Sequence, residues 1–245
     1  MNQILVTKKL YITPELKKKK KMYKIDFILS IFLVVALLGF YVYAEYDRNK
    51  SEEVSQDLLS NLNIEDKTTV SDKNVLVVVL NGTQEDIMVP ESERQTEENN
   101  QAVVSSSDGK EYTTIATINI PTISVKYPIL QPEQETTESI EETLKVSPCK
   151  FWGPEPNEVG NFCIVGHNYR NNKFFSKVPT LSNGDIIEIT DMKGKNIKYS
   201  VYDKYTVDPT DVSCTTQLTN GRKEITLITC TNDNAQRVIV KAKAQ

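Results

Sequence analysis

Two side chains that can do chemistry together lie at the facing ends of the last two strand-like runs in the chain. Cys230 ends the run ITLITC, and Arg237 begins the run RVIVKA. Both runs alternate as β-strands do, and the six residues TNDNAQ between them are rich in turn formers. If the two strands form an antiparallel hairpin, Cys230 and Arg237 face each other across the gap between the strands.

This pair, with one more residue, is suited to acyl transfer. An arginine beside a cysteine favours the thiolate, and its donors can hold an oxyanion. His167, the only histidine in the chain, ends the apolar run FCIVGH and can act as the acid and base. Simpler readings exist for each residue, because a strand cysteine is more often a small core residue, a lone histidine is more often not catalytic, and an arginine at a strand start is usually solvated.

The elements that must position these residues are mostly strands. From about residue 111 onward, short β-rich runs are separated by Pro, Gly and Asn, and they predict six to eight strands with little helix. An all-β barrel or sandwich follows, with a short helix at 138–146. The run NVLVVVLNG at 74–82 also reads as a strand, either added to the main domain or isolated; the pattern leaves both open.

The N-terminal part of the chain predicts a membrane anchor. Residues 1–24 carry eight lysines and one acid, and residues 25–44 include an uncharged run of 18 residues, FILSIFLVVALLGFYVYA. That run is longer than the apolar part of a signal peptide, and it approaches the roughly 20 residues that cross a bilayer. The lysines keep the N-terminus in the cytoplasm by the positive-inside rule. The rest of the chain is therefore expected outside the cytoplasm.

Residues 45–110 follow this anchor and carry fifteen acids against six bases, which predicts an acidic stalk or linker. Residues 111–245 then form the catalytic domain. The chain has a net charge of −4, which gives no case for binding nucleic acid.

Three motifs together resemble the sortases, the membrane-anchored cysteine transpeptidases of Gram-positive bacteria. TLITC (Thr226–Cys230) resembles the segment that carries the family's cysteine, and GNFCIVGHN (Gly160–Asn168) resembles the segment that delivers its histidine. RVIVKAK (Arg237–Lys243) resembles the last strand, which begins with the family's arginine. The resemblance covers about residues 111–243, and the anchor and the extracytoplasmic linker agree with it.

The resemblance implies a closed eight-stranded β-barrel and a thioacyl mechanism. Cys230 would be the nucleophile, His167 the general acid and base, and Arg237 the residue that stabilises the oxyanion or the substrate. The substrate would be a secreted protein with an LPxTG-like sorting signal. The acceptor would be an amine of peptidoglycan or of its lipid-linked precursor. Further residues at substrate-binding positions would be Thr229, Asn168, Val207 and Pro209.

This chemistry needs no cofactor, and no metal site is predicted. Some sortases are activated by calcium, but the acidic residues here do not form an oxygen cage, and no pair of cysteines has the spacing of a zinc site. The short loop between cysteine and arginine and the single N-terminal anchor resemble class D sortases, although TLITC also occurs in class A. Because no apolar tail precedes Gln245, pilin polymerisation is not expected.

Two other functions fit the same sequence. The thioacyl enzyme could be resolved by water, which would make the protein a cysteine endopeptidase, or the barrel could be an inactive membrane-tethered binding module. The presence of Cys230, His167 and Arg237 disfavours the inactive module. At most one disulfide is expected among Cys149, Cys163 and Cys214, with Cys230 left free.

Overall fold

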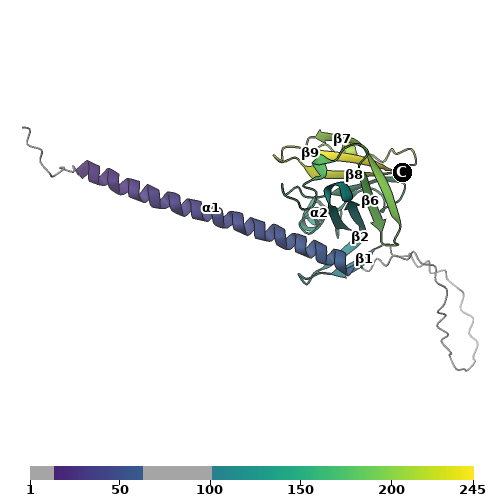
Figure 1. The fold of residues 1–245 in the computed structure, drawn as a ribbon, viewed down its shortest axis with the longest axis horizontal. Coiled ribbons are helices and arrows are strands. Elements are labelled where there is room, and N and C mark those ends of the chain that lie inside the picture. Colours follow the sequence, from purple (N-terminus) through teal and green to yellow (C-terminus); the bar gives the residue numbers. More distant parts are fainter. Residues whose placement is uncertain (1–13, 63–100) are drawn as a thin grey trace, which may run out of the picture. The chain divides into compact units, whose positions relative to one another are not determined.

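The computed structural model describes residues 14–62 and 101–245 of the chain. The chain divides into two compact units, one up to Asn49 and one from Lys50 to Gln245. The described part of the first unit is helical, and the second unit contains every strand of the described residues (Figure 1).

The helix α1 (Pro14–Asn61) contains the whole apolar segment that the sequence assigns to the membrane. Large side chains of that segment, such as Phe32, Leu37 and Phe40, are exposed. Among the described residues, α1 is the one helix long and apolar enough to cross a membrane. The segment thus has the form of a membrane span, while its topology and a single passage stay predictions.

Nine strands and a few short helices make up the second unit. The strands are β1 (Ala102–Ser105), β2 (Glu111–Ile120), β3 (Val125–Leu130), β4 (Cys149–Trp152), β5 (Gly160–Val165), β6 (Ile186–Asp191), β7 (Asn196–Val207), β8 (Lys223–Cys230) and β9 (Arg237–Ala244). The helix α2 (Thr137–Leu144) begins after Thr136, whose hydroxyl accepts a hydrogen bond from Ser139 N. Single 3-10 turns cover Pro121–Ile123, Val178–Thr180 and Ser213–Thr215.

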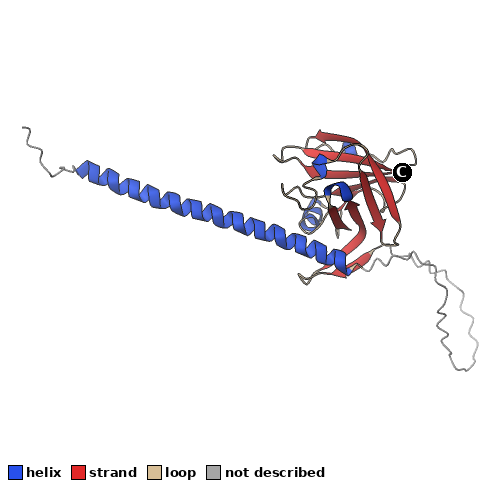
Figure 2. Cartoon of the chain, viewed as in Figure 1, coloured by secondary structure: helices blue, strands red, loops and turns tan. Residues whose placement is uncertain are grey.

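The strands form one sheet that closes on itself (Figure 2). Their order is β1-β2-β3-β4-β5-β8-β9-β7-β6, and a further pairing of β2 with β6 joins the ends of the eight strands β2 to β9. The strand β1 pairs with β2 outside this closed ring. The predicted all-β fold with a closed eight-stranded barrel is therefore confirmed. Closure also leaves the eight strands without a free edge.

Alternating side chains of the barrel strands fill its interior. In β5, Phe162 and Ile164 are buried in the central core together with Leu227 of β8 and Val240 of β9. The intervening residues Cys163, Ile228 and Ile239 lie on the outer face of the wall, where they form a separate buried cluster with Cys214 of the 3-10 turn Ser213–Thr215. Because β5, β8 and β9 are covered on both faces, they are a firm support for side chains at their ends.

The segment 45–110, predicted as a stalk, has regular structure at both of its described ends, in α1 and in β1. Val54 and Leu58, in the last turns of α1, are buried in a cluster with Leu130 of the barrel. The strand-like run at 74–82 lies outside the described residues. The division of the chain into domains stays a prediction, but the end of α1 belongs to the same compact unit as the barrel.

Candidate active site

The hairpin of β8 and β9 brings the predicted nucleophile and arginine together. In its antiparallel register, Cys230 is paired directly with Arg237. By strand alternation, Cys230 shares the outer face with Ile228, and Arg237 shares it with Ile239. Both Cys230 and Arg237 are partly exposed. A thiol and a guanidinium thus lie side by side at the rim of the barrel, accessible from outside.

Parallel pairing between β5 and β8 brings His167 to the same level. Val165 is paired with Ile228, and the next step of the ladder is a hydrogen bond of 3.0 Å from Gly166 N to Ile228 O. His167 lies two residues beyond Val165, and Cys230 lies two residues beyond Ile228. Neighbouring strands are about 4.8 Å apart, so the histidine and the cysteine leave the sheet as neighbours. Cys230 therefore stands on the strand between those of His167 and Arg237.

Asn168 ties the histidine loop to the cysteine strand. Its Nδ2 donates to the carbonyl oxygen of Cys230 at 2.9 Å and to Oδ1 of Asn232 at 3.0 Å, while its Oδ1 accepts from Arg170 N at 2.9 Å. The side chain is buried. These contacts hold the backbone of the two candidate catalytic residues together. A direct contact of this amide with substrate stays a prediction.

His167 is half-buried, and this burial lowers the pKa of its imidazole below the ordinary value. Glu141, in the middle of α2, works against this shift and raises the pKa, while Lys145 lowers it further. The ring of Tyr169 packs against the imidazole with 5.0 Å between ring centroids. Burial thus favours the neutral imidazole, which is the form that can accept a proton.

The other predicted substrate-binding residues have different surroundings. Thr229 is buried, and its hydroxyl donates to Gly166 O at 2.8 Å, so it supports the turn into His167. Val207, at the end of β7, is half-buried and is paired with Arg237. Pro209 is exposed two residues further on. Val207 and Pro209 thus lie on the side of the site where Arg237 is. Contact of Thr229, Val207 and Pro209 with substrate stays a prediction.

Gly166 is a position that residue chemistry alone does not reveal. A Cβ built on it would clash with the ring of Phe175. Phe175 N in turn donates to His167 O at 3.0 Å, so the ring and the histidine backbone belong to one packed turn. A side chain at 166 would push this turn off the barrel.

We expect Gly166→Ala to lower the free energy of unfolding by about 1–3 kcal/mol, because overpacking forces backbone shifts. Denaturant unfolding checks this. The double variant Gly166→Ala/Phe175→Leu should recover part of the loss, since it removes the ring that the new Cβ meets. Unchanged stability in the single variant would contradict the close contact.

All four cysteines are free thiols. Cys149, Cys163 and Cys214 are buried, and burial raises the pKa of Cys149 and of Cys163 to about 12. Burial also raises the pKa of Cys214. Cys230 is the cysteine with solvent access and is therefore the one placed to react. Across residues 14–62 and 101–245, no group of three or more His, Cys, Asp or Glu side chains is arranged to hold a metal ion.

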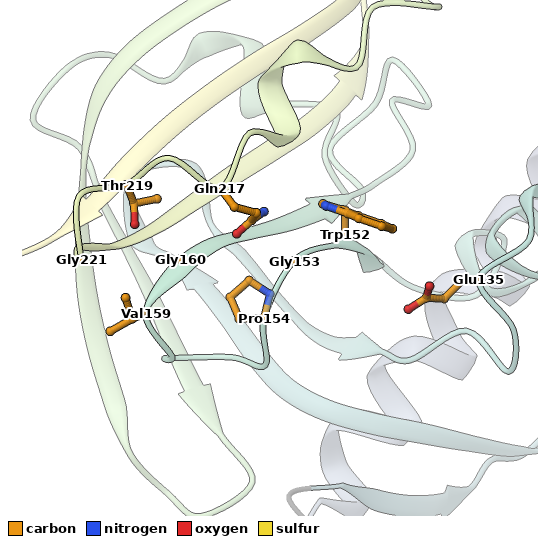
Figure 3. Close-up of a pocket in the computed structure, with 9 residues that line it drawn as sticks. All are labelled: Glu135, Trp152, Gly153, Pro154, Val159, Gly160, Gln217, Thr219 and Gly221. Carbon is orange, nitrogen blue, oxygen red and sulfur yellow. The ribbon is translucent and has the colours of Figure 1, made fainter.

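An open cavity of about 480 Å³ lies elsewhere on the barrel (Figure 3). Gly160, which lines it, is paired with Lys223 at the start of β5 and β8, whereas His167 and Cys230 follow the other ends of these strands. Gly160 and His167 are seven residue steps apart along an extended chain, roughly 23 Å. The cavity is thus distinct from the candidate active site. Its other lining residues include Trp152, Pro154, Val159, Gln217 and Gly221.

Comparisons with known proteins show which proteins this chain is similar to. The family model for the Sortase domain matches residues 118–245, more than half of the chain. Similar solved structures include a sortase D5 transpeptidase from Clostridium perfringens, 33% identical over 54% of this chain and 79% of that chain, with a TM-score of 0.47. A lid mutant of sortase A from Corynebacterium diphtheriae is 28% identical over 57% of this chain and 74% of that chain, with a TM-score of 0.48. A search of the curated proteins gave no match.

The matched region contains β3 to β9 and the end of β2, and with them the strands that carry the candidate site. It includes the cysteine, the histidine and the arginine that the three motifs single out. The chain belongs to the sortase family.

Proposed function

We propose that this chain is a cysteine transpeptidase that cleaves an LPxTG-like sorting signal and joins the new carboxyl end to a cell-wall amine. The substrate is a secreted protein, and the acceptor is an amine of peptidoglycan or of its lipid-linked precursor. The placement of Cys230 on the strand between those of His167 and Arg237, at one end of the barrel, is the observation that carries this proposal. Membership in the sortase family supports it.

In the proposed acylation step, the Cys230 sulfur attacks the carbonyl carbon of the threonine at the Thr–Gly bond. The neutral imidazole of His167 takes the thiol proton and passes it to the glycine amine as the C–N bond breaks. Arg237 donates hydrogen bonds to the oxyanion or to the substrate backbone. In the second step an acceptor amine attacks the thioester, His167 removes its proton, and the thiol is restored.

We infer the location of the enzyme from the N-terminal segment. We place residues 25–44 of α1 in the membrane, with the lysine-rich residues 1–24 in the cytoplasm and the barrel outside it. The long apolar helix supports this, as does a substrate that is itself secreted.

The test uses the full chain in detergent micelles or nanodiscs. The protein is incubated with a panel of LPxTG-type peptides, with and without glycine or a diamino acid as acceptor, and then analysed by mass spectrometry. We expect a thioacyl adduct on the peptide that contains Cys230 and an amine-linked product when acceptor is present. The three buried cysteines serve as internal controls for labelling.

Each other outcome identifies a different function. An adduct that yields acid product with every acceptor would make the protein an endopeptidase. Absence of adduct with all peptides, also after reduction of the protein, would favour a binding module and contradict the proposal.

Arg237 gives a further prediction. We expect Arg237→Ala to lower kcat/KM by about 10²–10³-fold, the usual cost of removing a donor from an oxyanion site. Arg237→Lys should restore little, because an ammonium does not reproduce the planar fork of donors. Steady-state kinetics with the best peptide checks both. Arg222→Ala is the matched control, since Arg222 lies just before β8, at the far end of the hairpin, and pairs with Glu224. Near wild-type kinetics in Arg237→Ala would exclude this role.

A further inference from the structure

The end of α1 is built into the catalytic unit. Its residues 50–61 belong to the same compact unit as the barrel, and Val54 and Leu58 are buried there. Polar contacts fix the same helix end. The hydroxyl of Ser55 donates to Ser147 Oγ at 2.9 Å, and Gln56 Nε2 donates to Lys126 O at 3.2 Å. This part of α1 therefore has a defined position on the barrel.

Glu52, one turn before these contacts, reaches the loop that carries His167. Its Oε2 forms an ion pair of 2.7 Å with Nζ of Lys173, and its Oε1 accepts a hydrogen bond of 3.2 Å from the hydroxyl of Tyr127. The side chains of Lys173 and Glu52 are 18% and 30% exposed, so the pair is partly desolvated. A pair in such surroundings is less screened than one on the open surface.

Tyr127 continues the contact into the loop. Its hydroxyl accepts from Phe174 N at 3.1 Å, and its ring stacks on that of Phe174 with 5.0 Å between centroids and an interplanar angle of 16°. Phe174 meets the ring of Tyr169 edge to face at 5.5 Å, and Tyr169 packs against His167 at 5.0 Å. Three aromatic contacts and one ion pair thus connect α1 with the imidazole.

The loop needs such support because of its backbone. Phe174 has a φ of 48°, in the left-handed region that bulky residues rarely adopt, and it bridges to Asn168 beside the histidine. A strained conformation persists when the surrounding structure holds it in place. Tyr127 and Glu52 are contacts that hold this residue from the side of α1.

We propose that Glu52 is a positioning residue, and that the end of α1 acts as a brace that holds the loop of His167 in its catalytic geometry. The inference rests on the proposed function of His167, and it extends the catalytic unit beyond the region that the family model matches. Glu52 acts through Lys173 and Tyr127 and contacts no reacting atom.

Loss of the brace has a defined electrostatic consequence. Burial lowers the pKa of His167. The charge of Glu141 opposes this shift, and the charge of Lys145 reinforces it. A loosened loop admits water to the imidazole, so the pKa of His167 should rise toward its ordinary value. The loss of a partly buried pair should also lower kcat by about 5- to 20-fold, while KM changes little because no substrate contact is removed.

The experiment uses the chain's single histidine as a probe. The full chain, carrying a tag without histidine, is labelled with ¹³C-histidine in nanodiscs, and the imidazole signal is titrated by NMR. Glu52→Ala removes both contacts. Glu52→Gln removes the charge but keeps an acceptor for Tyr127, so an intermediate effect is expected. Glu53→Ala is the matched control, because it removes the same kind of side chain from an exposed position of the same helix.

We expect Glu53→Ala to match the wild type. The pKa of His167 should rise and kcat should fall in both Glu52 variants, and more in Glu52→Ala than in Glu52→Gln. A His167 titration unchanged in both Glu52 variants would overturn the brace. The NMR titration tests the brace even if the wild type transfers no peptide, whereas absence of adduct in the wild type would count against the proposed function alone. If Glu52→Ala fails to fold, Glu52→Gln decides.

Discussion

Replacement of Cys230 by alanine is expected to abolish both the thioacyl adduct and the amine-linked product. The proposed reaction passes through a bond to this sulfur, and the buried thiols of Cys149, Cys163 and Cys214 cannot reach substrate. Loss of the nucleophile lowers turnover by about 10⁶-fold in a serine protease, and we expect an effect of similar size here. Mass spectrometry of the adduct, with chromatographic detection of the transfer product, measures the change.

Cys214→Ala is the matched control for this variant. Cys214 lies in the segment before β8, and its side chain is buried in the outer cluster with Cys163. We expect it to keep its activity and to lose about 1 kcal/mol of stability, because a small buried group is removed. Amine transfer by Cys230→Ala at a rate near that of this control would mean that another nucleophile carries the reaction.

The pairing of Cys230 with Arg237 was predictable because it is local. Two alternating runs joined by six turn-forming residues specify a hairpin, and the loop length specifies which residues face each other. The alignment of His167 with Cys230 is different, since β5 and β8 are parallel strands more than fifty residues apart in the chain. Alternation predicts both strands but not that they are neighbours. The resemblance to sortases supplied that placement.

The end of α1 was the least predictable element near the site. Its acidic composition favours a solvated stalk, and Val54 and Leu58 are too few to mark a buried face by periodicity. Its burial depends on tertiary partners such as Leu130 and on hydrogen bonds such as that of Tyr127 with Glu52. The role of Thr229 was unpredictable for the same reason. Its hydroxyl donates to Gly166 O, and no sequence pattern reveals that acceptor.

His167→Gln is expected to lower kcat/KM by about 10²–10⁴-fold, the range for loss of a general acid and base. Glutamine keeps a polar side chain of similar length but cannot carry the proton between the thiol and the amine. Asn172→Ala, an exposed position of the same loop, is the matched control and should behave as wild type. Steady-state kinetics with the best peptide and acceptor measures both variants.

The pH dependence of kcat/KM tests whether His167 is the group that takes the thiol proton. In the wild type, kcat/KM should fall as the pH drops through the pKa of His167, because the protonated imidazole cannot take the thiol proton. This fall should lie on the acid side of the usual histidine value, since burial lowers the pKa of His167. The fall should be absent from the residual activity of His167→Gln. If kcat/KM of His167→Gln falls over the same pH range as that of the wild type, then protonation of another group causes the fall.

Stability must be followed in the same range of pH. Because the pKa of His167 is lower in the folded chain than in the unfolded chain, the unfolded chain binds the proton more readily. The folded state therefore loses stability as the pH falls from the unfolded pKa of about 6.5 toward the folded pKa, and this loss stops below it. Denaturant unfolding at each pH separates this loss of folded protein from the loss of the catalytic base. An acid limb that vanishes after correction for the folded fraction would mean that protonation of His167 acts on the fold rather than on the reaction.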